Sequence, residues 1–237
     1  MAPCKVMVVE RYTPLRRRVT KLLKHGCAAL ALLGLGSLGA VTPAWAATAT
    51  SAAAVMQKFF QTSKTISADF QQEVVNHGGV VMQRAQGQLW IERPGRFRWN
   101  YAGKNGQMIV SDGQQVWLYE PALQQVTVQP LGKVLGSTPA ALIAGRDVLP
   151  ADFQISSLPA KDGLQWVLLT PKKGQSQGFT SIRMGFDATG QLRDMRMEDA
   201  FQQETVLHFD HVRVNVPIAS KTFHFTPPAG VDVLKNP

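Results

Sequence analysis

Hydrophobic and polar residues alternate along most of the chain. In one stretch Phe97, Trp99 and Tyr101 are separated by Arg98 and Asn100, and this period of two is typical of a β-strand with one apolar face. Such runs recur between Gly, Pro, Asp and Asn residues at the spacing of a β-meander. The runs are 87–94, 96–103, 106–113, 114–121, 123–131, 151–159, 163–173, 179–190, 191–199, 203–215 and 221–228. No helix-length segment connects them, so they predict an antiparallel sheet of about eleven strands, curled into a barrel or an unclosed half-barrel.

Two segments have helical patterns instead. The first places four apolar side chains on one helical face: Val55, Met56, Phe59 and Phe60. Strand character returns at 66–75, and 76–79 predicts a hairpin turn. The second segment, 137–148, has a Ser/Thr-Pro start and an apolar run that ends at Gly145. A short helix this apolar must cover another hydrophobic surface, so we expect a mainly β fold with an α lid over the concave apolar side of the sheet.

The apolar strand positions are candidates for the lining of a cavity. They are Phe97, Trp99, Tyr101, Met108, Val110, Trp117, Ile182, Met184, Phe186, Leu207 and Phe209. A filled barrel core explains the alternation equally well. The two helices favour a binding site, and walls rich in methionine and aromatic residues suit an adaptable apolar one. The strand parity through Pro94 leaves open whether Leu89 or Trp90 points inward.

The N-terminal residues have the organisation of a secretory signal peptide. A basic segment, 16–26, precedes an apolar run at 27–41, and 44–46 supplies a small-x-small cleavage pattern. The apolar run has fifteen residues, fewer than the roughly 20 that span a bilayer. We therefore expect cleavage after Ala46 and export to the periplasm.

Removal of residues 1–46 changes the charge of the protein. The whole chain carries 25 Lys and Arg and 16 Asp and Glu, a net charge of +9. The leader holds seven of the basic residues and one acidic residue, which leaves 18 against 15, or +3. Such a balance does not indicate nucleic-acid binding. Both cysteines, Cys4 and Cys27, lie in the leader, so residues 47–237 are expected to fold as one monomeric domain without disulfides.

None of the possible catalytic or ligand patterns has the context that its chemistry needs. Residues 174–178 match G-x-S-x-G, but a nucleophile elbow requires a following helix and a strand is expected here. His208 and His211 are three apart in a predicted strand, and therefore on opposite faces, so they do not chelate one metal. The basic-aromatic stretch 93–101 resembles a base-stacking surface, but the other strands are not basic. We predict no enzymatic activity, no metal and no cofactor.

Three motifs together resemble the family of periplasmic outer-membrane lipoprotein carrier proteins, LolA. They are "RPGRFRW" at 93–99, "SDGQQVWLY" at 111–119 and "TPAALIA" at 138–144. The resemblance extends over 51–237. It implies an unclosed eleven-stranded barrel with helices over its concave apolar side. It also implies a carrier that takes acylated lipoproteins from an ATP-driven transporter in the inner membrane to the outer-membrane receptor LolB.

The resemblance also assigns roles to individual residues. Arg93 corresponds to the family's arginine that holds the lid shut by hydrogen bonds to the lid helix, here 138–144. The predicted lid latch consists of Arg93, Pro139, Leu142 and Ile143. Phe97 corresponds to a phenylalanine at the cavity mouth that is implicated in contacts with the transporter and the receptor. Ala140 and Ala141 stand where relatives can carry bulkier residues, which bears on how firmly the lid is held.

Three other interpretations fit parts of the pattern. A periplasmic lipid-sensing regulator can share the half-barrel, but such regulators usually carry a second domain, for which the 191 residues of 47–237 leave little room. The receptor LolB is disfavoured because no cysteine begins the mature chain. The third of these interpretations is a structural barrel with a filled core.

Overall fold

The body of the molecule is one twelve-stranded sheet in the computed structural model of the chain. The structure describes residues 51–104, 106–134, 138–145, 151–172 and 178–235. The predicted leader, its cleavage after Ala46 and most of 174–178 lie outside the described residues. The strands are β1 (Thr65–Val75), β2 (Val81–Glu92), β3 (Arg96–Tyr101), β4 (Met108–Asp112), β5 (Gln115–Glu120), β6 (Gln125–Pro130), β7 (Phe153–Ser157), β8 (Gln165–Pro171), β9 (Phe179–Phe186), β10 (Leu192–Asp199), β11 (Glu204–Val214) and β12 (Asp232–Lys235).

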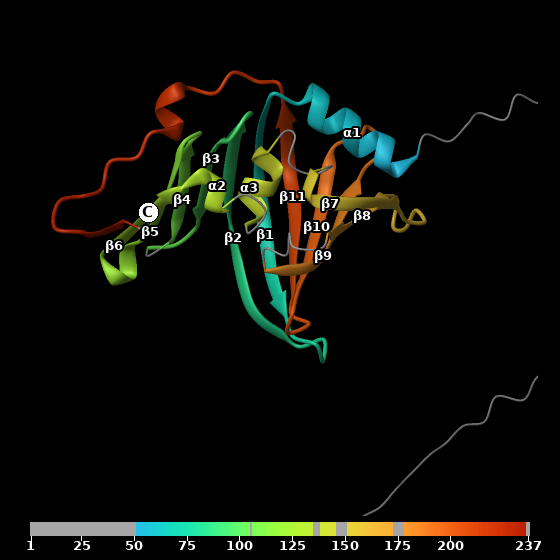
Figure 1. Cartoon of the computed structure of the whole chain (residues 1–237), viewed down its shortest axis with the longest axis horizontal. Helices are drawn as coiled ribbons and strands as arrows, with labels where there is room; N and C mark the ends of the chain where they lie inside the picture. Colours follow the sequence, from blue (N-terminus) through green and yellow to red (C-terminus); the bar gives the residue numbers. More distant parts are fainter. Residues whose placement is uncertain (1–50, 105, 135–137, 146–150, 173–177, 236–237) are drawn as a thin grey trace, which may run out of the picture. The chain divides into compact units, whose positions relative to one another are not determined.

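The sheet is unclosed, which is one of the two forms that the alternation allowed and the one that the family resemblance implied. Its strand order is β12-β6-β5-β4-β3-β2-β1-β11-β10-β9-β8-β7, with β12 and β7 at the two edges. Every neighbouring pair is antiparallel except β12, which runs parallel to β6. The strands curl around the face on which α1 (Ala52–Thr62) and α3 (Pro139–Ala144) lie (Figure 1).

The strand expected at 221–228 is not formed. This segment begins with the short 3₁₀ helix η2 (Ser220–Phe223) and continues without pairing to the sheet, and β12 pairs in its place. Pro227 and Pro228 have no N–H to donate to a ladder. The Phe223 side chain, 1% exposed, is instead buried against the sheet.

The helices α1 and α3 each begin at a residue whose side chain caps the helix. Ser51 accepts a hydrogen bond from the Ala54 N–H at the start of α1, and Thr138 Oγ1 accepts one from the Ala141 N–H at 3.2 Å at the start of α3. α1 packs against β7, β8 and β9, whereas α3 packs against β2 and β3. The remaining short helices are α2 (Leu131–Val134) and η1 (Pro121–Leu123). No helix in the described part of the chain is long and apolar enough to cross a membrane.

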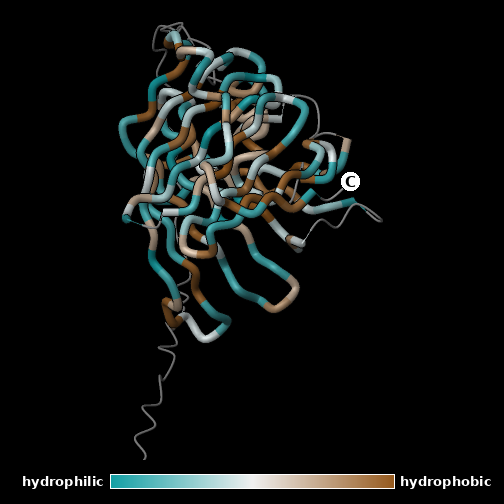
Figure 2. The backbone as a smooth tube through the Cα atoms, turned by 90° about the vertical axis from the view of Figure 1, so that its left-hand side faces the viewer, coloured by the Kyte–Doolittle hydropathy of each residue, from teal (hydrophilic) through white to brown (hydrophobic). Residues whose placement is uncertain are grey.

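The pairing registers assign each strand residue to a face. Phe97 pairs with Ile91 and Trp99 with Leu89, whereas Trp90 pairs with Arg98. Leu89 therefore shares the face of Trp99, and Trp90 lies on the other one. We call the face that carries Phe97 and Trp99, and that the helices cover, the inner face, and the opposite one the outer face. Along the tube in Figure 2 hydrophobic and hydrophilic residues alternate accordingly.

The outer face of β4–β6 is itself apolar and covered. Val110 and Val126 are fully buried there. The C-terminal segment crosses this region after β11 and returns to β6 (Figure 1). It is held by the Arg98 Nη1, which donates to the Thr222 carbonyl at 3.3 Å, and by the Arg96 Cζ, 4.8 Å from the centroid of the Phe223 ring. The two faces of this half of the sheet thus belong to separate hydrophobic clusters.

Candidate functional site

Eight of the eleven predicted cavity residues lie together on the inner face. They are Phe97, Trp99, Tyr101, Ile182, Met184, Phe186, Leu207 and Phe209. All are fully or almost fully buried except Tyr101, which is partly exposed. The buried residues of α1 and α3 belong to the same cluster. The inner face is therefore a continuous apolar surface that the two helices cover in this structure.

The expectation that Met108, Val110 and Trp117 share this surface is wrong. Met108 pairs with Asn100 and Val110 with Arg98, and Trp117 pairs in turn with Val110. Strand neighbours that pair across a ladder point to the same side of a sheet. All three side chains therefore lie on the outer face, where the Arg98 Nη2 is 2.8 Å from the Met108 Sδ.

An aromatic cluster occupies the middle of the inner face. The Phe70 ring lies 4.5 Å from the Trp99 ring and 5.3 Å from the Tyr101 ring, and the Trp99 ring lies 6.4 Å from that of Phe209, all between centroids. A Cβ on Gly87 would come within 1.9 Å of the Asn100 carbonyl oxygen on β3 and within 2.7 Å of the Phe70 Cζ. Glycine at this position thus leaves room for the Phe70 ring to lie over β2.

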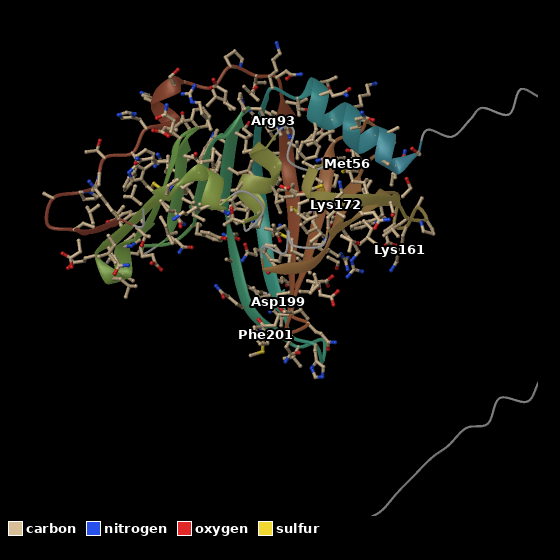
Figure 3. All side chains as sticks on the ribbon, viewed as in Figure 1. Met56, Arg93, Lys161, Lys172, Asp199 and Phe201 are labelled. Carbon is tan, nitrogen blue, oxygen red and sulfur yellow. The ribbon has the colours of Figure 1, made fainter. Side chains whose placement is uncertain are left out.

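Arg93 joins both covering helices to the sheet. It follows β2 directly, and its side chain is buried, with 7% of the residue exposed. The Nε donates to the Ile143 carbonyl of α3 at 3.0 Å, and Nη1 donates to the carbonyl of Ser63, the C-cap of α1. Figure 3 shows Arg93 near the C-terminal end of α1. One guanidinium thus connects two helices that are separate in the sequence.

The surroundings of Arg93 favour this geometry. Its Cζ lies 4.5 Å from the centroid of the Phe60 ring and 5.2 Å from that of Phe59, within the range of cation–π attraction. The backbone N–H of Arg93 donates to the Lys64 carbonyl at 2.8 Å, and that of Gly95 to the Ala144 carbonyl at 3.2 Å. The turn between β2 and β3 therefore contacts the C-terminal ends of both helices through backbone and side chain.

The other predicted lid residues are placed as follows. Leu142 and Ile143 are 2% and 1% exposed, and their side chains belong to the inner-face cluster. Pro139 begins α3, where its missing N–H leaves no hydrogen bond unmade. Ala140 and Ala141 are also buried, and their small side chains belong to the same cluster.

Phe97 is fully buried in this structure, with 0% exposed. Its strand packs against α3, and the Phe97 side chain belongs to the same cluster as the buried side chains of that helix. Contact between Phe97 and another protein therefore requires movement of the covering helix.

Several inner-face residues were not among those predicted from the sequence. Phe70 lies on β1 opposite Phe209, and Leu89 and Ile91 lie on β2 opposite Trp99 and Phe97. The same period of two that selected β3 is present in 66–75 and would have identified Phe70. The expectation that His208 and His211 lie on opposite faces is wrong. The pairing register between β1 and β11 shifts between Ser67 and Asp69, and both histidines contact aspartates of the outer face, His208 at Asp210 and His211 at Asp69.

Comparison with known proteins identifies the family of the chain. The family model of the outer membrane lipoprotein carrier protein LolA matches residues 61–226. The chain is 40% identical over 186 residues to the outer-membrane lipoprotein carrier protein of Nitrosomonas europaea, covering 78% of this chain and 90% of that one. It is 38% identical over 216 residues to the protein of that name from Dechloromonas aromatica, covering 91% and 97%.

Among solved structures, a LolA superfamily protein from Nitrosomonas europaea aligns with a TM-score of 0.44 at 14% identity, covering 75% of this chain and 99% of that one. The family assignment comes from the sequence matches, since they extend over most of the described strands and helices. The chain belongs to the LolA family of outer membrane lipoprotein carrier proteins.

Proposed function

We propose that the protein is a periplasmic chaperone that binds the acyl chains of lipoproteins on its inner face. It carries them from an ABC transporter in the inner membrane to the outer-membrane receptor LolB. The observation that carries the proposal is the inner face itself: a continuous apolar surface covered by two helices that one arginine holds in place. The names of the relatives, outer-membrane lipoprotein carrier proteins, support it.

The energetics of acyl-chain binding explain why such a surface needs a competing cover. An acyl chain of on the order of 16 carbons gains about 0.8 kcal/mol per buried CH₂, or roughly 10 kcal/mol or more in total. A carrier that retained all of that free energy would not release its cargo. In the closed structure the buried side chains of α1 and α3 occupy the apolar surface instead, so cargo has to displace them.

Arginine is suited to hold such a cover. The two carbonyls that it contacts lie at the C-terminal ends of α1 and α3, where the last carbonyl groups of a helix lack partners within the helix. A cation is favourable at this end of a helix, and a guanidinium has five N–H donors and no acceptor. Arg93 therefore stabilises the closed state through hydrogen bonds that break when cargo enters.

This balance gives transfer a direction. Loading breaks the Arg93 hydrogen bonds and exposes the apolar sides of both helices, so it needs work, which the ATP-driven transporter supplies. Unloading re-forms those contacts, so a receptor without an energy source can accept the cargo. The first 46 residues serve in this proposal as the cleaved leader that delivers residues 47–237 to the periplasm, and the mass of the secreted protein tests the cleavage after Ala46.

A probe titration tests the proposal. The purified protein is titrated with bis-ANS, and a triacylated lipoprotein is then added as competitor. We expect stoichiometric probe binding that the lipoprotein displaces, because both occupy the inner face. A folded protein that binds neither the probe nor the lipoprotein would show that the inner face is a permanently filled core, and the proposed function would fail.

A further inference from the structure

The inner face contains a buried hydrogen-bond donor without a partner. The Trp99 indole is 1% exposed, and within the described ranges no group accepts a hydrogen bond from its Nε1–H. Buried indole N–H groups usually have an acceptor. This donor lies on β3, among the side chains that the proposed function assigns to the acyl chains.

Two further polar side chains adjoin it. The Tyr101 hydroxyl donates to the Gln72 Oε1 at 2.9 Å, which leaves the Gln72 amide N–H groups directed away from this bond. Burial raises the pKa of the Tyr101 phenol, and the neighbouring Trp99 and Gln72 groups offset part of that rise. The Trp99 N–H is thus near the phenol oxygen but does not reach hydrogen-bond geometry with it.

A pocket joins two members of this polar group, Gln72 and Tyr101, to solvent. Gln72 and Tyr101, together with Ala85 of β2 and the turn that follows β3, line a pocket of about 360 Å³. The apolar cluster of Phe70 and Trp99 begins next to it. The inner face therefore changes from hydrocarbon to hydrogen-bonding groups over a short distance along β3, away from Arg93.

We propose that Trp99, Tyr101 and Gln72 form a recognition site for the carbonyl group at the head of an acyl chain. The inference rests on the proposed function and specifies its ligand: a chain joined through an ester, rather than any hydrocarbon. With the hydrocarbon on the inner face, the carbonyl oxygen accepts hydrogen bonds from the Trp99 Nε1–H and the Gln72 amide. A carbonyl that leaves water needs a donor, and this buried donor needs an acceptor.

The test compares two lipopeptides that differ only in this group. One carries two hexadecanoyl ester chains on a glyceryl-cysteine, and the other carries two hexadecyl ether chains. We expect the protein to bind the ester about tenfold more tightly, as one buried donor warrants. Burial of apolar surface alone predicts the opposite order, because the ether chain is slightly more apolar.

Two variants and one spectrum locate the preference. Trp99→Phe removes the N–H and keeps an aromatic ring, so it should bind both lipopeptides with the affinity of the ether. Trp90→Phe, on the outer face of β2, is the matched control and should keep the tenfold preference. In the unsubstituted protein the Trp99 indole N–H resonance should move downfield with the ester and not with the ether.

The outcomes separate this inference from the proposed function. Equal affinities of the unsubstituted protein for the two lipopeptides would overturn the carbonyl site while leaving acyl-chain binding in place. A preference that survives in Trp99→Phe, with an indole resonance that the ester does not move, would also overturn it. Failure to bind either lipopeptide would overturn both the site and the proposed function.

Discussion

Replacing Arg93 by leucine removes the group that holds the covering helices. The substitution deletes the hydrogen bonds to the Ile143 and Ser63 carbonyls, each worth about 1.5–3 kcal/mol for a charged donor. Cation–π contacts with the two phenylalanines of α1 add about 0.5–2 kcal/mol. Leucine restores apolar contact and removes the cost of burying a guanidinium, which offsets part of the loss.

The net effect on the closed state is a destabilisation of about 2–4 kcal/mol, since the offset cancels roughly half of the deleted interactions. A change of this size shifts the equilibrium between closed and open states by about 30- to 1000-fold. The variant should therefore accept lipoprotein as well as or better than the unsubstituted protein. It should release that lipoprotein poorly, because closing of the lid no longer compensates for loss of the acyl chains.

The assay is transfer of a triacylated lipoprotein from the purified, loaded carrier to LolB. Arg96→Leu serves as the control, because Arg96 contacts the Phe223 ring and Glu92 rather than the covering helices. We expect slow transfer from Arg93→Leu and normal transfer from Arg96→Leu. Normal transfer from a loaded Arg93→Leu protein would refute the assignment of Arg93 as the residue that promotes release.

Three further changes test the packing and the electrostatics. Gly87→Ala places a Cβ 1.9 Å from the Asn100 carbonyl oxygen of β3 and 2.7 Å from the Phe70 ring, so urea unfolding should show a loss of at least about 1–3 kcal/mol; an unchanged midpoint would contradict the tight approach. Thr138→Ala removes the N-cap of α3 at a cost of about 1 kcal/mol, which should increase bis-ANS binding without unfolding the sheet. Asp187 accepts hydrogen bonds in the turn after β9, and although burial raises its pKa, bonds from Thr189, Arg193 and Gln191 lower it overall. Its contribution to stability is therefore complete above about pH 4 and lost as the pH falls through the lowered pKa; Asp187→Asn should flatten the fall of the unfolding free energy below pH 4, and an identical pH profile would contradict this.

The alternation in β3 predicted its faces correctly because only one of them is apolar. Phe97 and Trp99 lie on the inner face, and Arg98, opposite them, reaches the C-terminal segment. In β4 and β5 both faces carry apolar residues, since the C-terminal segment covers the outer face. Period-two alternation does not distinguish two buried faces, and for this reason the predicted inner-face positions of Val110 and Trp117 are wrong.

Contacts made by backbone groups could not be predicted from the pattern of hydrophobic and polar residues. The carbonyls of Ile143 and Ser63 carry no sequence pattern that identifies them as acceptors, so the role of Arg93 came from the family resemblance alone. The expected strand at 221–228 failed for a related reason. The burial of Phe223 against Arg96 depends on tertiary contact that local propensity does not contain.

The most direct test of acyl-chain binding on the inner face is photo-crosslinking. A lipopeptide with a diazirine at the end of one acyl chain is bound to the unsubstituted protein, irradiated, and the modified residues are identified by mass spectrometry. We expect adducts on inner-face residues such as Phe97, Trp99 and Met184. Adducts concentrated instead on Met108, Val110 or Trp117 of the outer face would contradict the account.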